Sequence, residues 1–376
     1  MKIVHVFHNY YPVVGGLERA VQSLAEELAK MGHEVHVITS RLSAGNRPKE
    51  EVVNGVYVHR VKALKPYFPD LTYPLEYVEN VIRDADIVHG HSQNSLFTVK
   101  VIEKAKRLGI KTAIYFMAVD ALYDHPNPLV KFLGSFYANY MLKKAIELSD
   151  TRLVKSFRDL EILRSRYGVE VLHVPDGVSE EIVDAPDMAE EFRERYGIRG
   201  PFVVYIGRLH RLKGVDVLIK AVSIAVKEHP KLKAVIIGPG DQKPYKELAQ
   251  RLGIENHVVF LGYVDEKTKI GALDASIALV LPSICNYVEV FSIVISEAWA
   301  RSKPVIASAV GEISYRVKHM VNGILVPPKN PQKLAEAMIT LLNDENLRTK
   351  LGAEGRRNIL TWNEIATKII SIYKQA

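Results

Sequence analysis

The fold of this chain is decided by residues 1–40, which read MKIVHVFHNY YPVVGGLERA VQSLAEELAK MGHEVHVITS. Residues 3–7 form an apolar run that predicts a strand, and residues 35–38 form a second one. Between them, apolar side chains recur at spacings of three and four, and Gly32 follows as a stop signal. The apolar helix positions are Leu17, Ala20, Val21, Leu24, Ala25, Leu28 and Ala29. Because a helix connects the two strands, they must run parallel, and the stretch predicts a βαβ unit.

The same alternation recurs along the chain. Further strands are expected near 87–89, 112–116 and 152–154, and a second series begins at Pro201. That series predicts strands at 202–206, 234–237, 258–261, 278–281 and 305–307, and helices at 215–226 and 245–252. The pattern is typical of an α/β protein with parallel sheets covered by helices. We expect two doubly wound, Rossmann-like domains, 1–180 and 201–361, joined by an acidic linker at 181–200 and facing each other across a cleft.

Composition excludes several classes of protein. Cys285 is the only cysteine, so an intramolecular disulfide and a thiolate zinc site are excluded, and a reducing, cytoplasmic compartment is favoured. No apolar run approaches the roughly 20 residues of a membrane span. Residues 201–376 carry 24 basic and 16 acidic side chains and hold the whole positive surplus. Since aromatic interleaving is missing, this surplus favours a compact polyanion such as a diphosphate over nucleic acid.

Two glycine-containing segments are candidate anion sites. Gly15 and Gly16 stand between the first predicted strand and helix, where bare backbone amides bind an anion or simply form a turn. Gly207 and Arg208 follow a predicted buried strand, and Lys213 precedes the next helix. Two cations near a helix N-terminus favour a phosphate group. The alternative is a solvated loop with two exposed charges.

Glu289 and Glu297 lie in a mostly apolar segment that enters a helix through Ala300. Carboxylates are costly to bury without partners, so both require hydroxyls, amides or cations. On one continuous helix the two acids would be about 12 Å apart. One acid could then meet a ribose and the other a sugar. The alternative is a pair of acids on a helix face without a binding role.

Two further clusters resemble metal ligands, but the sequence predicts no metal. Asp84 and Asp86 precede a predicted strand rather than follow it, which indicates a solvated turn between a helix and a strand. His89 and His91 would share one face of a strand, but the sequence names no third ligand. We expect His91 to be a polar group at the carboxyl end of its strand, facing the cleft.

Residues 131–144 carry an aromatic stripe between basic ends. The apolar members are Phe132, Leu133, Phe136, Tyr137, Tyr140 and Met141. Such a stripe at helical spacing is typical of a core helix, and the alternative is peripheral contact with the inner face of a membrane. The same alternatives apply to Tyr67, Phe68 and Tyr73, which lie in a Pro-rich loop that could meet an acceptor.

Taken together, these residues resemble family 4 of the retaining glycosyltransferases, which have the two-domain GT-B architecture. The resemblance spans nearly the whole chain. It rests on residues 15–16, 86–92, 174–178, 207–209, 213–214, 238–240, 281–283, 289, 297, 303–307, 322–327 and 362.

The resemblance implies transfer of a hexosyl unit from a nucleotide sugar, with UDP or GDP as the expected diphosphate, to a hydroxyl group. The configuration would be retained, without metal or cofactor, and the acceptor would be a lipid-linked glycan, a sugar or a small molecule. Arg208, Lys213 and Glu289 would be catalytic. The implied donor-binding set is Gly15, Gly16, Gly207, Arg208, Lys213, Gly238, Gly262, Tyr263, Val264, Glu289, Phe291, Ser292, Ile293 and Glu297.

Individual roles also follow from the resemblance. Arg208 and Lys213 would hold the diphosphate, and the Gly16 amide a phosphate oxygen. Glu297 would bind the ribose and Glu289 the transferred sugar. The final helix, 362–376, would cross back onto the first domain.

The sequence departs from the family pattern near the sugar. The histidine that usually follows the fourth strand of the first domain is Met117 here, and Asp120 is the nearest polar substitute. The usual Glu-Gly-Phe-Gly segment ends in Ser292, and Glu312 replaces a later glycine. These departures leave a second class open: a sugar-nucleotide-binding protein or subunit with weak or no transferase activity.

Overall fold

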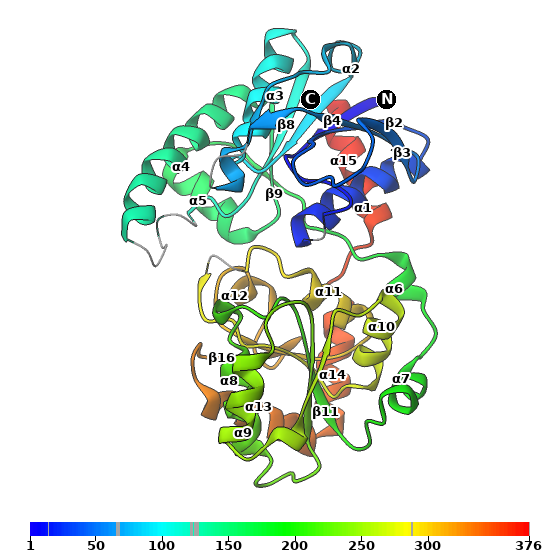
Figure 1. Cartoon of the computed structure of the whole chain (residues 1–376), viewed down its shortest axis with the longest axis vertical. Coiled ribbons are helices and arrows are strands. Elements are labelled where there is room, and N and C mark those ends of the chain that lie inside the picture. Colours follow the sequence, from blue (N-terminus) through cyan, green and yellow to red (C-terminus); the bar gives the residue numbers. More distant parts are fainter. Residues whose placement is uncertain (14, 65–67, 121–122, 124–127, 287–288, 376) are drawn as a thin grey trace. The chain divides into compact units, whose positions relative to one another are not determined.

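The computed structural model describes residues 1–13, 15–64, 68–120, 123, 128–286 and 289–375. The chain forms two compact units (Figure 1). Unit 1 consists of Met1–Gly177 and Thr361–Ala376, and unit 2 consists of Val178–Leu360. Each unit has its own parallel sheet and its own buried apolar core.

Unit 1 is built on an eight-stranded sheet with the order β10-β9-β8-β7-β1-β2-β4-β3. The strands are β1 (Lys2–Val6), β2 (Glu34–Ser40), β3 (Glu50–Val53), β4 (Val56–Val61), β7 (Ile87–His91), β8 (Lys111–Phe116), β9 (Thr151–Val154) and β10 (Leu172–His173). A separate antiparallel pair is formed by β5 (Ala63–Leu64) and β6 (Tyr73–Pro74). The helices are α1 (Gly16–Lys30), α2 (Glu79–Arg83), α3 (Leu96–Arg107), α4 (Pro128–Leu148), α5 (Phe157–Tyr167) and α15 (Trp362–Gln375), with a 3-10 turn η1 at Pro69–Leu71.

The βαβ unit expected at residues 1–40 is confirmed. β1 pairs with β2 in parallel, from Lys2 opposite Glu34 to Val6 opposite Ile38. Helix α1 buries the predicted apolar face, including Leu24. The sheet is parallel throughout except for the β3–β4 hairpin, which we did not predict. Its signal in the sequence is Asn54-Gly55, whose φ angles of 49° and 83° suit a tight hairpin turn.

Unit 2 is built on a six-stranded parallel sheet with the order β13-β12-β11-β14-β15-β16. The strands are β11 (Phe202–Ile206), β12 (Lys233–Ile237), β13 (Val258–Gly262), β14 (Leu279–Leu281), β15 (Val305–Ser308) and β16 (Gly323–Val326). The helices are α6 (Glu180–Asp184), α7 (Ala189–Tyr196), α8 (Val215–Ala225), α9 (Lys243–Arg251), α10 (Glu266–Ala275), α11 (Ile293–Ala300), α12 (Ile313–Arg316), α13 (Pro331–Asn343) and α14 (Glu345–Arg356). Short 3-10 turns are η3 (Arg211–Lys213) and η4 (Glu255–His257).

The segment that we expected to link the domains, 181–200, lies inside unit 2 and not between the units. It contains most of α6 and the whole of α7. Val178 and Ile182 pack with Ile270 and Ala300 in a small apolar cluster. The acidic composition of the segment is therefore that of a solvated outer surface on two packed helices.

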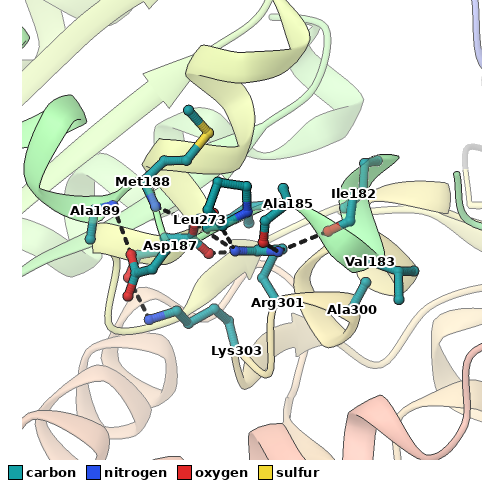
Figure 2. Close-up of polar contacts among 12 residues, drawn as sticks. Ile182, Val183, Ala185, Asp187, Met188, Ala189, Leu273, Ala300, Arg301 and Lys303 are labelled. Carbon is teal, nitrogen blue, oxygen red and sulfur yellow. Dashed lines mark hydrogen bonds and ion pairs between the residues drawn. The ribbon is translucent and has the colours of Figure 1, made fainter. Parts of the chain in front are cut away.

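Arg301 fastens this segment to the rest of unit 2 (Figure 2). Its guanidinium donates to the carbonyl oxygens of Ile182 at 2.9 Å, Ala185 at 2.8 Å and Pro186 at 3.0 Å. Its Nε and Nη2 donate to the two carboxylate oxygens of Asp274 at 2.7 and 2.9 Å. Three of these acceptors lie at the end of α6, where helix carbonyls have no partner within the helix. The planar guanidinium presents several donors in a fixed plane and can reach all of these acceptors, which the compact ammonium group of a lysine could not do.

The C-terminal helix α15 belongs to unit 1, although it follows unit 2 in the chain. It packs against α1, and Asn363 donates to the Glu27 carboxylate at 3.2 Å. A Cβ on Gly177 would lie 2.6 Å from the Trp362 backbone nitrogen, so only glycine fits where α15 begins. Ile365, Ile369 and the other apolar positions of α15 are buried, so the helix completes the core of unit 1.

We predict that Arg301→Ala destabilises unit 2 by about 3–5 kcal/mol, because it leaves the buried Asp274 carboxylate without its cation. The midpoint of urea unfolding, followed by Trp299 fluorescence in a Trp362→Phe background, measures the loss. Lys333→Ala, which removes an exposed ion pair with Glu336, is the control and should shift stability by less than about 1 kcal/mol. Equal midpoints for the two variants would contradict the role of Arg301.

Candidate functional site

Three glycines line the carboxyl edge of the unit 2 sheet. Gly207 follows β11, Gly238 follows β12, and Gly262 ends β13. The Gly207 amide donates to Ile237 O at 2.9 Å, and the Gly238 amide donates to Gly262 O at 2.7 Å. A Cβ on Gly238, whose φ is +138°, would lie 2.0 Å from Gly207 O. The three strand ends therefore pack backbone against backbone and leave an edge bare of side chains.

Arg208 and Lys213 leave this edge from the loop after β11. The loop is held because Leu209 N donates to Pro239 O at 2.8 Å. It ends at Gly214, whose φ of +69° and close approach to Pro282 O require glycine, and α8 begins there. Arg208 is exposed, whereas Lys213 is half-buried and its Nζ lies 2.7 Å from Glu289 Oε1. The predicted pair of cations thus stands at the N-terminus of a helix, where anions are favoured.

Glu289 is buried, with 3% of its surface exposed, and is the acceptor of three donors. Its Oε1 accepts from Lys213 Nζ and from the Ser283 hydroxyl, and its Oε2 accepts from the Ser292 hydroxyl. Burial raises the pKa of the Tyr205 phenol, and the charge of Glu289 raises it further. Sequence reasoning found Glu289 and included Ser283 in the segment 281–283, but it assigned no role to Ser283, which lies six residues before Glu289.

Glu289 and Glu297 do not lie on one continuous helix. α11 begins at Ile293, and Ser292 before it adopts a left-handed conformation with φ of +46°. A non-glycine residue in that region ends helical geometry. Glu289 lies in the preceding loop, where its carbonyl accepts from Glu312 N at 2.9 Å. The separation of about 12 Å, which assumed a helix, therefore does not apply.

Glu297 lies within α11 and is also buried beside a cation. Lys269 Nζ of α10 donates to Glu297 Oε1 at 2.6 Å and lies 2.5 Å from Glu266 Oε1. Burial alone would lower the pKa of Lys269, but the charges of Glu297 and Glu266 outweigh burial and raise it. Sequence reasoning missed Lys269, although a lysine within the apolar run 269–273 was a usable signal of a buried ion pair.

Arg316 fixes the loop between the two acids. Its guanidinium lies 3.9 Å from the centroid of the Phe291 ring and donates to the carbonyl oxygens of Phe291 and Ser292. Gly311 packs against the other side of the loop, where a Cβ would lie 2.4 Å from Asn286 O. Sequence reasoning missed Arg316 as well. The loop carrying Glu289 is therefore held from two sides.

The remaining predicted residues of unit 2 lie around the same strand ends. Gly262 has a φ of +69°, and the next residue, Tyr263, is 63% exposed. Val264 is half-buried and precedes Asp265, which caps α10 by accepting from Thr268 N at 2.8 Å. Ile293, also half-buried, is the first residue of α11.

In unit 1, the glycine pair starts α1 as expected. Gly15 is the N-cap, without a side-chain cap. A Cβ on Gly16 would meet nothing within 4 Å, so space is open beside its amide. The Glu18 carboxylate approaches Gly15 and accepts from Asn9 Nδ2 at 3.3 Å. The first turn of α1 therefore favours an anion, and the Glu18 carboxylate already lies beside it.

Met117 and Asp120 lie in the loop after β8. Gln93 brackets Met117, because its side chain accepts from Met117 N at 2.9 Å and donates to Met117 O at 3.0 Å. Asp159 accepts from the amides of Ala118 and Val119, while burial raises the pKa of its carboxyl. Asp120 forms an ion pair with Arg158. This loop is thus built by Gln93 and Asp159, which sequence reasoning missed.

The two clusters of candidate metal ligands differ in burial. Asp84 and Asp86 lie in a turn between α2 and β7, as predicted, and Asp86 accepts from Lys2 N at 2.7 Å. His89 and His91 share a face of β7, also as predicted, but a third histidine, His5, lies beside them. The His91 ring packs against His5 and Tyr115 and is 1% exposed. His91 therefore points into the interior of unit 1 and not toward an open edge.

Two segments of the chain, covering most of unit 1 and most of unit 2, match known families. Residues 14–181 match the family described as Glycosyltransferase Family 4, and residues 188–358 match that described as Glycosyl transferases group 1. An uncharacterized glycosyltransferase of Methanocaldococcus jannaschii is 29% identical over 100% of this chain and 98% of its own length.

Solved structures show the same architecture. The sucrose-phosphate synthase of Thermosynechococcus elongatus has a TM-score of 0.79 at 22% identity, covering 99% of this chain and 98% of its own. The Anabaena protein HepE in complex with UDP-glucose has a TM-score of 0.76 at 19% identity, covering 100% of both chains. The expected fold class, two Rossmann-like α/β domains of the GT-B type, is confirmed.

We predict that Gly238→Ala destabilises unit 2 by more than about 3 kcal/mol, because its Cβ cannot fit against Gly207 O. Gly253→Ala is the matched control. Its φ is +67° but nothing lies within 4 Å of its Cβ, so only the backbone strain of about 1 kcal/mol remains. Thermal unfolding measures both variants. Similar melting temperatures for the two variants would mean that the strand ends move apart at little cost in stability, and would contradict the prediction.

Proposed function

Because this chain belongs to the group 1 glycosyltransferases of family 4, we propose that it transfers a hexosyl unit from a nucleoside diphosphate sugar to a hydroxyl group with retained configuration. The observation that carries the proposal is the buried Lys213–Glu289 pair beside the glycine edge, next to the exposed Arg208. In this arrangement a cation for the phosphates and an acceptor for the sugar hydroxyls stand in direct contact.

Arg208 and Lys213 are proposed to bind the diphosphate. The Arg208 guanidinium has no hydrogen bond or ion pair within the part of the chain that the structure describes, so it is available for a bidentate contact with phosphate. The N-terminus of α8 adds a positive partial charge. As the glycosidic bond breaks, negative charge grows on the leaving diphosphate, and cations fixed beside it stabilise the transition state more than the ground state.

Glu289 is proposed to orient the transferred sugar. A carboxylate has about four lone-pair directions, and Lys213, Ser283 and Ser292 occupy three of them among the described residues. The remaining direction would accept one sugar hydroxyl. Because three donors fix the carboxylate, it needs little further ordering when the donor binds.

Glu297 is proposed to bind the ribose. Its Oε1 accepts from Lys269, and a carboxylate can accept from the two neighbouring ribose hydroxyls through its remaining lone pairs. The Gly16 amide would contact a phosphate oxygen from the open N-terminus of α1. The acceptor hydroxyl would attack on the face that the diphosphate leaves, and the departing phosphate would take its proton. No metal or cofactor has a role in this proposal.

The first experiment is a calorimetric screen of UDP, GDP, ADP and their hexose conjugates, followed by assays of sugar release without acceptor and without metal. HepE was solved with UDP-glucose, which supports UDP as the first diphosphate to test. Slow release of the sugar would support the transferase. Tight binding without release, even with broad acceptor mixtures, would favour the alternative, a sugar-nucleotide-binding protein. Met117 gives that alternative a physical basis, because its thioether is a poor partner for a sugar hydroxyl.

We predict that Arg208→Ala and Lys213→Ala lower kcat by about 10²–10³-fold, because each removes a charge that stabilises the leaving group. Glu297→Ala should weaken donor binding by about 10–100-fold, while Glu266 remains to pair Lys269. Steady-state kinetics and donor calorimetry measure these effects. Lys220→Ala, on the exposed face of α8, is the control and should change neither. Unchanged turnover in the first three variants would contradict the site.

We further propose that the acceptor is lipid-linked and that α4 contacts the bilayer. Both faces of α4 carry apolar residues: Met141 and Ala145 are buried, while large side chains on the other face are 58–66% exposed. The exposed ones are Leu129, Phe132, Leu133, Phe136 and Tyr140. None of the helices among the described residues combines the length and the apolar composition that crossing a membrane needs. We propose a peripheral contact, in which the exposed apolar face of α4 lies against the bilayer surface.

The neighbouring loop extends this apolar surface. Tyr137 of α4 donates to Asp70 O at 3.4 Å and to Asn94 O at 2.7 Å, which ties η1 to the helix. Phe68 and Tyr73 flank η1 and are 46% and 40% exposed, and Tyr67 lies outside the described residues. Lys131 and Lys143 are exposed on α4, so anionic headgroups are the expected partner.

The double variant Phe132→Glu/Phe136→Glu should reduce binding to anionic phosphatidylglycerol vesicles at least 10-fold, because it places two charges in the apolar face. Vesicle flotation measures the bound fraction. Val52→Glu, on the exposed β3 of the same unit, is the matched control and should bind like the wild type. If the wild type does not float with anionic vesicles, the membrane contact is wrong, whereas the proposed transfer chemistry is tested separately by the donor assays.

A further inference from the structure

Three histidines face one another in the interior of unit 1. His5 of β1 pairs in register with His89 of the neighbouring strand β7, and His91 follows two residues later on the same face. Their exposed fractions are 0%, 0% and 1%. The ring centroids lie 5.3 Å apart for His5 and His89, 5.2 Å for His5 and His91, and 4.5 Å for His89 and His91. The parallel register therefore brings three imidazoles into one cluster.

The nitrogen atoms of these rings have the spacing of ligands around one ion. One nitrogen from each ring lies within 4.8 Å of the others, and His5 Nδ1 lies 3.0 Å from His91 Nε2. Tetrahedral ligands on zinc–nitrogen bonds of 2.0–2.1 Å would lie about 3.4 Å apart. This value is close to the 3.0 Å between His5 and His91 and lies within the 4.8 Å limit for all three rings, so small ring movements would bring one nitrogen of each ring to coordination distance.

The cluster does not satisfy its own hydrogen bonding. Among the described residues, His5 Nε2, His89 Nε2 and His91 Nδ1 have no partner, which is half of the six ring nitrogens. Orphaned polar atoms in a buried position are rare and require an explanation such as an ion or a water, and one ion can take one nitrogen from each ring. Burial also lowers the pKa of all three rings. Neutral imidazole is the form that coordinates metal.

The surroundings complete the site. The Tyr373 hydroxyl of α15 lies 2.5 Å from His89 Nδ1, which places a phenol oxygen beside the three rings. Tyr115 stacks on His89 and His91. The nearby cation, Lys155, is paired with Asp176 at 2.6 Å, which offsets its repulsion of a bound cation.

We propose that His5, His89 and His91 bind one divalent transition-metal ion, with zinc as the expected species and the Tyr373 oxygen as fourth ligand or as acceptor from a coordinating ring. Imidazole ligands favour zinc, copper, nickel and cobalt over magnesium or calcium. The ion would join β1, β7 and α15, and would thereby fasten the C-terminal helix to the sheet. This role is structural, and it is distinct from the donor binding proposed for unit 2.

The test uses the full chain without an oligohistidine tag. Elemental analysis of the purified protein should find one equivalent of zinc per chain. After removal of metal with a chelator, zinc added at 100 times its Kd should raise the melting temperature by roughly 5–10 °C. Tyr373→Phe should weaken zinc binding about 10–100-fold, and His91→Gln should abolish it. His33→Gln, near the surface of the same unit, is the matched control and should keep one equivalent.

Cobalt provides a second, spectroscopic readout of the site. Co²⁺ bound by three imidazoles and one oxygen in a tetrahedral site should give intense visible absorption bands, whereas Co²⁺ in water is octahedral and nearly colourless. Loss of these bands in His91→Gln but not in His33→Gln would assign the site. Metal content at trace level, together with unchanged melting temperature and a spectrum of aqueous Co²⁺, would overturn the proposal and leave buried water as the partner of the orphaned nitrogens.

Discussion

The candidate site of unit 2 depends on one close approach of backbone. Gly238 lies so near Gly207 O that a Cβ would be 2.0 Å from it, and this contact aligns the ends of β11 and β12. The aligned ends fix the loop that carries Arg208, through the bond from Leu209 N to Pro239 O. The same loop delivers Lys213 to Glu289. A shift of these strand ends would therefore move both cations relative to Glu289, which lies in the separate loop before α11.

Much of this architecture could be predicted because strands and helices alternate in a regular pattern. The apolar runs located most strands of the two main sheets but not β3, β4, β10 and β16, and glycine and cations at the strand ends marked the anion-favouring loops. The β3–β4 hairpin escaped prediction because β3 begins with Glu50-Glu51 and is partly exposed. Glu289 was found, but its place outside α11 was not, because the left-handed Ser292 breaks a segment whose composition is that of a helix.

Contacts between residues that lie far apart in the sequence could not be predicted. Lys269 and Arg316 acquire their roles only where α10, α11, α12 and the loop after β14 pack together. The parallel pairing of β1 with β7 brings His5 into register with His89, and Tyr373 reaches His89 from the last helix. Periodicity assigns a residue to a face of its own element, but it does not say which residue of another element stands opposite.

The two lysine–glutamate ion pairs of unit 2 hold their carboxylates in place more than they stabilise the fold. Lys213–Glu289 and Lys269–Glu297 are both largely removed from water, and the desolvation of such pairs offsets much of their attraction. Their benefit in the proposed reaction is that both carboxylates are ordered before the donor arrives, so binding energy is not used to order them. Ser292 adds to this order, because its hydroxyl bonds Glu289 while its backbone takes a conformation that costs about 1–2 kcal/mol for a non-glycine residue. Arg208, in contrast, is exposed, and in the proposed reaction the diphosphate would order it. The acids that would orient the sugar and the ribose are thus fixed in advance, while the exposed cation remains adjustable to the diphosphate as its charge grows.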